Sequence, residues 1–387
     1  MSEDRCSSAD TNRLRIWHVE GAPSPEAVDG ANATTWQLAI EQARTGHDVT
    51  LFVVDEPSPA AEITSQRAGL FLFQPRSSRL RYNTRQIEEL IRLCRPDVVH
   101  MHSVFVPRHA LLARRLHRSG IPYLVTPNSL APALLKRRWI RKRLYVPLVE
   151  QRRLRRAAAI AVITEKEAAV IRGLVPGYRG IVRAIFDPIE TRLFEHPGWK
   201  GQTSPPRLVY LGRFDVQHKG IDNLVELGRN LSPEIEIHLY GVPDRRTAKR
   251  LKDLRKRRPR NVNFHAPVWG DEKLRVLNEA AMCIQLSRWE VFGVSPAEAM
   301  ALGVPTALAD TMDMASIVGE SDAVLVVPSD LKRAARAIES VLANSERLHQ
   351  LSVNGRRFAG ANYKSSIVSN QYVELYRDML EAPQMPR

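Results

Sequence analysis

Two cations stand six residues apart in the segment Tyr210–Gly220, where Arg213 and Lys219 follow Gly212 and precede Gly220. An arginine can bridge two phosphate oxygens, and a lysine adds a point charge to the same group. Glycines let the backbone approach a ligand closely. The segment therefore predicts a loop that binds a diphosphate, and the alternative is a strand end that carries two surface cations.

Two glutamates, Glu290 and Glu298, enclose seven residues that include Gly293 and Pro296. Proline suits the first turn of a helix, so we expect a helix to begin near Gly293 and to offer free amides to an anion. Glu290 then lies in a loop and Glu298 lies in the helix, so both can face one ligand. Carboxylates accept hydrogen bonds from sugar hydroxyls, including those of a ribose. The pattern favours a sugar-binding pair over two surface glutamates.

Short apolar runs alternate with amphipathic stretches, which is typical of βα units and parallel sheets. The stretch Pro188–Pro206 has four prolines and two glycines and predicts a linker. The fold class is therefore α/β, with two Rossmann-like doubly wound parallel-sheet domains facing each other across a cleft. The expected strands are Leu14–Val19, Val49–Val54, Val98–His102, Tyr123–Thr126, Ala158–Ile163 and Val182–Phe186, then Leu208–Leu211, Ile235–Tyr240, Val262–His265, Met282–Leu286, Thr306–Ala309 and Val324–Val327.

These elements predict an N-terminal domain over 13–190, a C-terminal domain over 205–365 and a last helix over 366–387, which could pack back on the first domain. One face of this helix is expected to carry Val368, Tyr372, Leu375, Tyr376 and Leu380.

The composition excludes several classes of protein. The chain has 387 residues, of which 44% are hydrophobic, so it is long and apolar enough for two folded domains. No apolar run approaches the roughly 20 residues of a membrane-spanning helix, and the polar start of the chain predicts no secretory signal. Three widely spaced cysteines exclude a disulfide scaffold and fit a reducing cytoplasm.

The net charge of +15 is concentrated in two segments, 136–156 and 245–260, each with ten basic residues and one acid. Such patches attract anions. Trp139 and Tyr145 accompany an apolar stripe in the first segment, which favours peripheral contact with an anionic membrane surface; packing of that stripe on its own domain is the alternative. Nucleic-acid binding is a further alternative, but interleaved aromatic residues are lacking.

His100 and His102 share one face of a predicted strand, so a two-histidine metal site is conceivable. The sequence offers no evident third ligand, and we expect no metal.

The two glutamates, preceded by the Leu-Gly-Arg-Phe segment that contains Arg213 and by Lys219-Gly220, resemble family 4 of the retaining GT-B glycosyltransferases, also called group 1. The resemblance is strongest over 207–320 and extends weakly to segments 46–50, 96–102 and 158–167. It implies a cytoplasmic, metal-independent hexosyltransferase without cofactor. Such an enzyme would transfer a sugar, with retention of configuration, from a nucleotide-diphosphate sugar. The expected acceptor is a cell-surface glycan or lipid-linked acceptor of the exopolysaccharide, capsule or lipopolysaccharide type, at the inner face of the membrane.

The resemblance also implies roles for single residues. The catalytic set would be Glu290 at the donor sugar with Arg213 and Lys219 at the diphosphate. Glu298 would bind the ribose. The remaining donor-binding residues would be His265, Val268, Phe292, Gly293 and Val294, and the residues at the acceptor or cleft would be Gly30, His102 and Asn128.

Three positions depart from the family pattern. A single glycine, Gly30, stands where a glycine pair is usual, and Asn128 stands where many members have a histidine. The linker entry reads Asp-Pro-Ile-Glu over 187–190. A catalytically weakened homologue is therefore a third interpretation.

Overall fold

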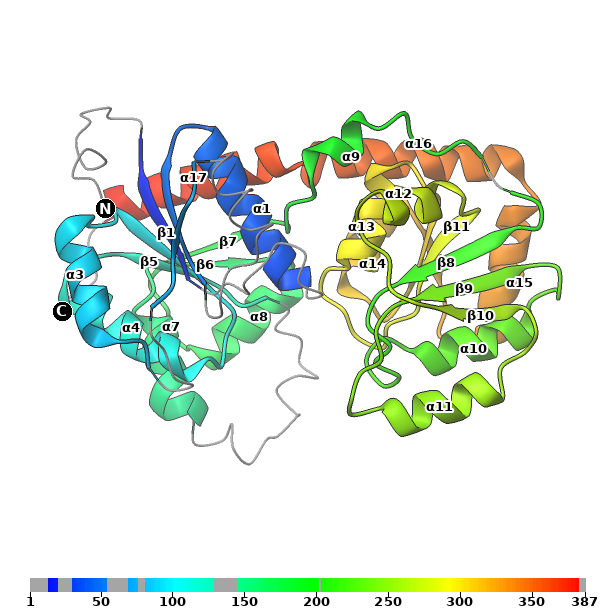
Figure 1. Cartoon of the computed structure of the whole chain (residues 1–387), viewed down its shortest axis with the longest axis horizontal. Coiled ribbons are helices and arrows are strands. Elements are labelled where there is room, and N and C mark those ends of the chain that lie inside the picture. The colour runs from blue at the N-terminus through cyan, green and yellow to red at the C-terminus, as the bar shows by residue number, and fades with distance from the viewer. Residues whose placement is uncertain are drawn as a thin grey trace. The chain divides into compact units, whose positions relative to one another are not determined.

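The computed structural model describes residues 13–19, 30–53, 69–75, 81–128, 145–201 and 203–382. The chain divides into two compact units, and Figure 1 shows the helices and strands of each in sequence colours. Unit 1 comprises residues 1–188 and 365–387, and unit 2 comprises residues 189–364. Each unit is built on a parallel sheet, so the predicted pair of Rossmann-like domains is confirmed.

Unit 1 has a seven-stranded sheet in the order β3-β2-β1-β4-β5-β6-β7. Strand β3 is only three residues long and half-buried, and the sequence pattern did not predict it. The other strands lie where they were expected. The strands are β1 (Arg15–Val19), β2 (Asp48–Phe52), β3 (Phe71–Phe73), β4 (Val98–His102), β5 (Tyr123–Thr126), β6 (Ala159–Val162) and β7 (Ile181–Ala184).

Alternate residues of these strands face two separate hydrophobic layers, as the two-residue period of a strand requires. Ile16 packs in the layer under α1 (Gly30–Arg44) and α17 (Ser365–Glu381), whereas Trp17 packs in the layer under α3 (Thr84–Leu93), α4 (Pro107–Arg118) and α8 (Glu165–Leu174). The π-helix η2 (Val146–Glu150) and the α-helix α7 (Gln151–Arg155) follow α4 and β5 in the chain.

Helix α17 contributes the predicted side chains Val368, Tyr372, Leu375 and Tyr376 to the first layer. Leu380 was predicted to share this face, but it is 43% exposed. Met379 is buried there instead.

Unit 2 has a six-stranded sheet in the order β10-β9-β8-β11-β12-β13. Its strands are β8 (Arg207–Leu211), β9 (Glu236–Tyr240), β10 (Val262–His265), β11 (Met282–Gln285), β12 (Thr306–Ala309) and β13 (Leu325–Val327). Its helices are α9 (Thr191–Glu195), α10 (Ile221–Asn230), α11 (Ala248–Lys256), α12 (Gly270–Asn278), α13 (Val294–Ala301), α14 (Asp313–Gly319), α15 (Leu331–Leu342) and α16 (Ser345–Asn362).

The segment predicted as a linker is part of unit 2 from Ile189 onward. The Trp199 indole nitrogen donates to the Ala280 carbonyl at 2.7 Å. Arg356 of α16 donates to the carbonyls of Phe194 and His196 at 2.8 and 2.7 Å. These side-chain anchors hold a segment whose prolines and glycines suggested a free connection.

Both sheets reverse their strand order at one place, between β1 and β4 in unit 1 and between β8 and β11 in unit 2. Ligands of open α/β sheets bind at such a reversal, beyond the carboxyl ends of the strands. The loops that follow β8 and β11 contain the predicted diphosphate-binding segment and Glu290, so the fold brings them to the same edge.

Candidate active site

The loop after β8 is held in shape by its own polar groups. The buried Asp215 carboxylate accepts hydrogen bonds from the backbone amides of Gln217 and His218, at 3.2 and 3.0 Å. This is an Asx turn, which aspartate favours. The Lys219 amide donates to the Asp215 carbonyl at 2.9 Å. Lys219 is therefore presented by a preformed turn.

Lys219 and Glu290 form an ion pair between the two loops, in which the ammonium group donates to Oε2. The lysine side chain is 18% exposed and the glutamate side chain 7%. The Ser287 hydroxyl donates to the same carboxylate oxygen at 3.4 Å. A charge-assisted hydrogen bond in such a sheltered place fixes both groups. The structure thus joins two predicted catalytic residues directly.

Glycine is required where these loops meet. Gly220 has a φ of 64°, and a Cβ placed on it would lie 2.1 Å from the Leu286 carbonyl oxygen at the end of β11. Both facts exclude a larger residue without movement of the backbone. The glycine that the sequence suggested for close approach to a ligand therefore serves a close approach between two loops.

Arg288 binds the two loops together, and sequence reasoning missed it. Its guanidinium donates to both carboxylate oxygens of Asp222 at 2.8 and 3.0 Å, and to the Asn223 side chain at 3.0 Å. It also donates to the Val216 carbonyl at 3.0 Å. Nothing in the local sequence distinguishes this arginine, because its partners lie more than 60 residues earlier.

Trp289 and His218 stack with ring centroids 4.9 Å apart. Burial lowers the pKa of His218, although the Glu290 carboxylate opposes that shift. His218 Nε2 lies 2.9 Å from the Trp289 carbonyl oxygen, which can only accept, so this nitrogen carries the proton. A neutral His218 thus contacts the loop that carries Glu290 through a hydrogen bond and ring stacking with Trp289.

Helix α13 begins directly after this loop. Gly293 is its N-cap residue, and no side chain caps the first turn. Uncapped amides and the helix dipole favour an anion or a hydroxyl oxygen at this end. The Phe292 ring is buried against Tyr363 with centroids 5.1 Å apart, so only its backbone is available to a ligand. The helix start agrees with the prediction, with Val294 as the first helical residue.

Glu298 lies within α13 and pairs with Lys273 of α12, with Nζ 2.7 Å from Oε1. The glutamate side chain is 11% exposed and the lysine side chain 25%. Lys273 is a second residue that sequence reasoning missed. The ion pair holds the Glu298 carboxylate at a partly sheltered position from which it can accept a hydrogen bond from a hydroxyl group.

Arg213 is the most open of the predicted residues, with 46% of its side chain exposed. Its Nε lies 3.9 Å from Oδ2 of the buried Asp244. Tyr210 donates to the Arg213 carbonyl at 2.9 Å and so fixes the backbone while the side chain stays accessible.

His265 ends β10, and Val268 follows in the next loop. The imidazole of His265 stacks on Tyr240 with centroids 4.4 Å apart and on His238 with centroids 5.0 Å apart. Burial and the neighbouring His238 lower its pKa. A cavity of about 490 Å³ lies beside it, lined also by Phe264, Arg255 and Arg258. A flat aromatic group could stack there.

The predicted residues of unit 1 lie near the reversal between β1 and β4. Gly30 is the first residue of α1. Asn128 follows β5 with a φ of 52°, and its buried amide nitrogen has no hydrogen-bond partner among the described residues. Ser103 and Phe105, after β4, also have positive φ values, of 69° and 63°. Non-glycine residues with such angles gather at functional sites.

His102 is buried and belongs to an interior network instead of an open surface. Its Nε2 lies 3.0 Å from Nδ1 of His18, whose Nε2 lies 2.8 Å from Gln42 Oε1. His100 contacts Tyr376 at 2.8 Å and Thr126 at 2.6 Å. The network therefore joins both strands at the reversal to α1, β5 and α17.

Nitrogens of His18, His100 and His102 lie within 4.8 Å of one another, so His18 supplies the third histidine that the sequence did not suggest. A hydrogen bond accounts for the closeness of His18 and His102, and the His100 ring stacks on the His102 ring with centroids 4.0 Å apart. His18 Nε2 must donate to Gln42 Oε1, so its Nδ1 accepts the proton of His102 Nε2. Burial lowers the pKa of His18 to about 4 and lowers the pKa of the other two.

The basic segment 136–156 is described only from residue 145, and Trp139 lies outside the described residues. Leu148 is 56% exposed. Arg153 is buried in an ion pair with Glu150, at 2.5 Å. This arginine was counted as part of the basic surface, and the structure removes it from that surface because it is needed to neutralise a buried acid.

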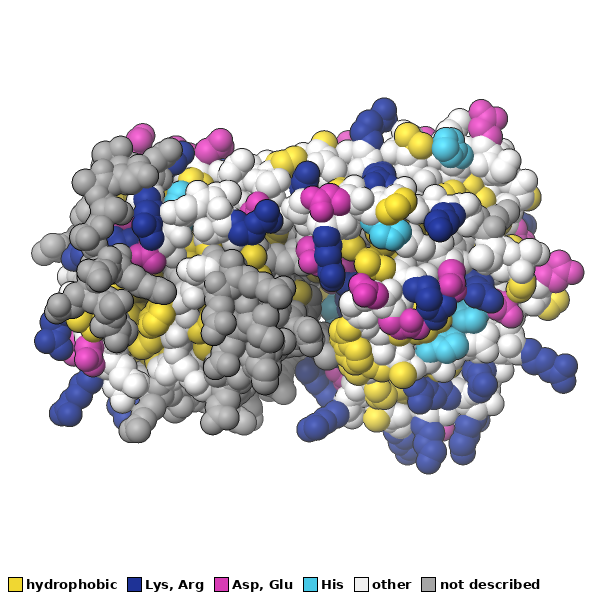
Figure 2. Space-filling model, turned by 45° about the horizontal axis from the view of Figure 1, so that its top comes forward, with side chains coloured by type: hydrophobic (Ala, Val, Ile, Leu, Met, Phe, Trp, Pro, Cys, Tyr) yellow, Lys and Arg dark blue, Asp and Glu magenta, His cyan; other side chains and the backbone are white. Residues whose placement is uncertain are grey.

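The second basic segment, 245–260, contains α11. Figure 2 shows Lys and Arg side chains gathered along the lower margin of unit 2, where Figure 1 places this helix. Lys249, Lys252 and Lys256 are exposed. Among the residues that the structure describes, Arg250 is the only basic residue of this segment in an ion pair, with Asp222 at 2.5 Å. Across the described ranges, no helix is long and apolar enough to cross a membrane.

Two known protein families match this chain. Residues 28–191 match the family described as Glycosyltransferase Family 4, and residues 192–358 match Glycosyl transferases group 1. The chain belongs to the group 1, family 4 glycosyltransferases. The resemblance found in the sequence is thereby confirmed.

Individual relatives are distant. Alpha-maltose-1-phosphate synthase of Mycolicibacterium smegmatis is 23% identical over 395 residues, which cover 94% of this chain and 99% of that protein. GDP-mannose:cellobiosyl-diphosphopolyprenol alpha-mannosyltransferase of Xanthomonas oryzae pv. oryzae is 25% identical over 306 residues, covering 75% and 76%.

Two solved structures have the same fold. Sucrose-phosphate synthase from Thermosynechococcus elongatus superposes with a TM-score of 0.77 at 22% identity, covering 96% of this chain and all of that one. Anabaena Alr3699/HepE in complex with UDP-glucose gives a TM-score of 0.72 at 14% identity, covering 95% and 100%.

Proposed function

We propose that this glycosyltransferase transfers a hexose from a nucleotide-diphosphate sugar, with retention of configuration and without a metal, to a cell-surface glycan or lipid-linked acceptor. The observation that carries the proposal is the Lys219–Glu290 pair at the strand reversal of unit 2, next to the uncapped start of α13. A departing diphosphate needs cations, and a sugar needs carboxylates and amides to hold its hydroxyls.

The roles follow from exposure and partners. Arg213 is accessible and can bridge phosphate oxygens, while Lys219 adds charge from the sheltered side. Glu290 holds Lys219 in place and accepts hydrogen bonds from the hydroxyls of the donor sugar. Glu298, oriented by Lys273, accepts hydrogen bonds from the ribose hydroxyls. The stacked rings of His265 and Tyr240 flank the base.

The HepE structure bears UDP-glucose, and the Xanthomonas relative is named for GDP-mannose and a diphosphopolyprenol acceptor. These names support a nucleotide-sugar donor and a lipid-linked acceptor for this chain, and we propose that the product is a glycan of the exopolysaccharide, capsule or lipopolysaccharide type. The protein would then act in the cytoplasm, peripheral to the inner face of the membrane, with contact through 136–156.

A thermal-shift panel of UDP-, GDP- and ADP-sugars tests the donor, followed by turnover with the sugar that binds. Lys219→Ala should lower kcat/KM about 30- to 1000-fold, because a charge-assisted contact in a closed site contributes about 2–4 kcal/mol. Glu290→Gln keeps an acceptor of similar shape and should mainly lower kcat. Near-normal turnover of Lys219→Ala would contradict the assignment.

The panel also separates the other interpretations. Salt-dependent DNA binding through the α11 segment, without any nucleotide-sugar binding, would favour a nucleic-acid-binding protein. Normal donor binding without turnover would favour a weakened homologue, which Asn128 and the single Gly30 suggest.

A further inference from the structure

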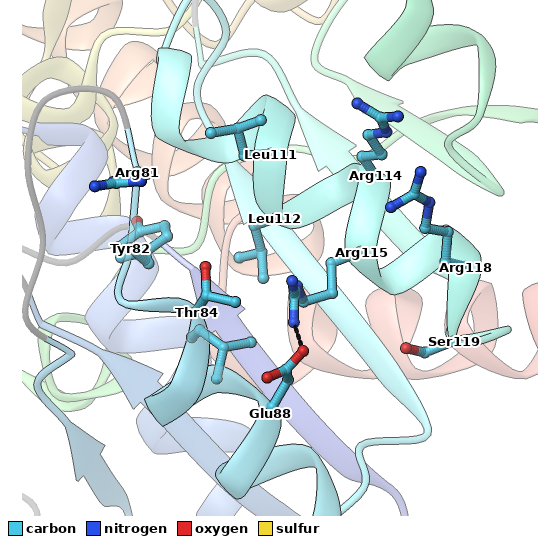
Figure 3. Close-up of a pocket in the computed structure, with 11 residues that line it drawn as sticks. Arg81, Tyr82, Thr84, Glu88, Leu111, Leu112, Arg114, Arg115, Arg118 and Ser119 are labelled. Atoms are coloured by element: carbon cyan, nitrogen blue, oxygen red, sulfur yellow. Dashed lines mark hydrogen bonds and ion pairs between the residues drawn. The ribbon is translucent and has the colours of Figure 1, made fainter.

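A second basic cavity lies in unit 1, far along the chain from the residues assigned to the donor. It is a groove of about 440 Å³ between α3 and α4, and Figure 3 shows the side chains that line it. Its basic lining consists of Arg81, Arg114, Arg115 and Arg118.

The two helices present their lining residues at helical spacing. Leu111, Arg114, Arg115 and Arg118 follow the i, i+3, i+4, i+7 pattern of one face of α4. Thr84, Ile87 and Glu88 form the matching face of α3. The groove is therefore a continuous surface built by two neighbouring helices, and not a chance gap between loops.

The charge of the groove is strongly positive. Four arginines line it against one acid, Glu88, which is already paired with Arg115. Arg114 and Arg118 are exposed, and neither has an ion-pair partner among the residues that the structure describes. An exposed guanidinium group can bind two phosphate oxygens through two parallel hydrogen bonds.

The groove also has an apolar wall. Leu111 is 51% exposed, and the buried side chains of Leu112, Ile87 and Tyr82 also line the groove. An inorganic anion would leave this wall unused, whereas a phosphate carried on a hydrocarbon chain would cover both parts. Burial of apolar surface would add to the charge-assisted contacts.

We propose that the α3–α4 groove binds a phosphate or diphosphate group carried on an apolar chain. The phosphate would contact Arg114 and Arg118, and the chain would lie against Leu111. This site is distinct from the donor site of unit 2 and does not depend on the function proposed above. Two sources share this chemistry: a soluble prenyl-type diphosphate and the headgroup of a phospholipid in a bilayer.

Titration of the full chain with farnesyl diphosphate and with inorganic diphosphate, followed by hydrogen exchange, tests the proposal. Both probes should protect peptides of 84–93 and 107–118, and farnesyl diphosphate should bind at least ten-fold more tightly. Protection over 212–220 would report the donor site instead, so the two sites are read separately.

The double charge reversal Arg114→Glu/Arg118→Glu should weaken both probes at least ten-fold at the groove. Leu111→Ser should weaken farnesyl diphosphate alone. Lys332→Glu/Arg336→Glu is the matched control, because these exposed residues are also four apart on a helix, α15 of unit 2. Absence of protection at α3 and α4 in the wild type, or equal loss in both double variants, would overturn the proposal.

Sedimentation with phosphatidylcholine vesicles, with and without phosphatidic acid, decides the source. Sedimentation only with phosphatidic acid, lost in Arg114→Glu/Arg118→Glu, assigns the groove to a bilayer headgroup. Farnesyl diphosphate binding without sedimentation assigns it to a soluble ligand.

Discussion

Acidification should destabilise unit 1, because His18, His100 and His102 are held neutral in its core. Burial lowers the pKa of His18 from 6.5 to about 4. Between these values the folded state binds fewer protons than the unfolded chain. The stability due to neutral His18 is therefore complete above about pH 6.5, is lost progressively as the pH falls from 6.5 to 4, and is absent below pH 4. Lowering the pH from 7.5 to 5 should cost about 2 kcal/mol through His18 alone.

Urea unfolding at the two pH values measures this loss, and hydrogen exchange on peptides of β1 and β4 assigns it to unit 1. His18→Gln cannot titrate, so it should be less stable at pH 7.5 but should lose about 2 kcal/mol less on acidification. His349→Gln is the control, because His349 is exposed on α16 of unit 2. If His18→Gln retained the full pH dependence of the wild type, the reasoning would be refuted.

Three further perturbations test how unit 2 builds its site. Gly220→Ala should destabilise unit 2 by about 2 kcal/mol or more in thermal unfolding, because its Cβ would meet the Leu286 carbonyl at a positive φ; Gly360→Ala, with no atom within 4 Å of its Cβ, should be neutral or stabilising. Glu298→Gln should raise the Kd of the nucleotide product, measured by calorimetry, more than it lowers kcat, since the ribose does not react. If Glu290→Gln instead raised this Kd and Glu298→Gln did not, the roles of the two glutamates would be reversed. Arg288→Met should lower kcat, because the loop that presents Lys219 would lose its hydrogen bonds to Arg288, and Arg288→Lys should lower kcat less. Equal activity of both variants and the wild type would show that Arg288 does not position Lys219.

The sheet was readable from the sequence because its signal is local. Twelve of the thirteen strands lie at short, mostly apolar segments between turns, where the sequence predicted them. Strand β3 was missed because three half-buried residues leave no period to detect. The segment after Pro188 was misread because proline and glycine report backbone conformation, whereas the anchors of Trp199 and Arg356 depend on distant partners.

The site was readable to the extent that its residues lie in two short segments. Local spacing made Lys219 and Glu290 candidates, but it could not show that they pair, because 71 residues separate them. Arg288, Lys273 and His18 were missed for a related reason. Each acts through a partner on another element, and only the strand order reveals which elements are neighbours.

The pairing of Lys219 with Glu290 changes how the cations of the site should be understood. Arg213 and Lys219 were predicted to bind the same diphosphate. Lys219 is sheltered and bound to Glu290, whereas Arg213 is half-exposed and 3.9 Å from Asp244. A sheltered charge is costly unless it is paired, so the ion pair with Glu290 offsets that cost and orients Lys219 before any ligand arrives. On the proposed function, an incoming diphosphate would meet one exposed cation, Arg213, and one cation already fixed in an ion pair, Lys219. Fixed charge is the kind that lowers a barrier, because no reorganisation is needed during the reaction. On this argument Glu290 contributes to catalysis through Lys219 as well as through the sugar, so the effects of Lys219→Ala and Glu290→Gln should not add.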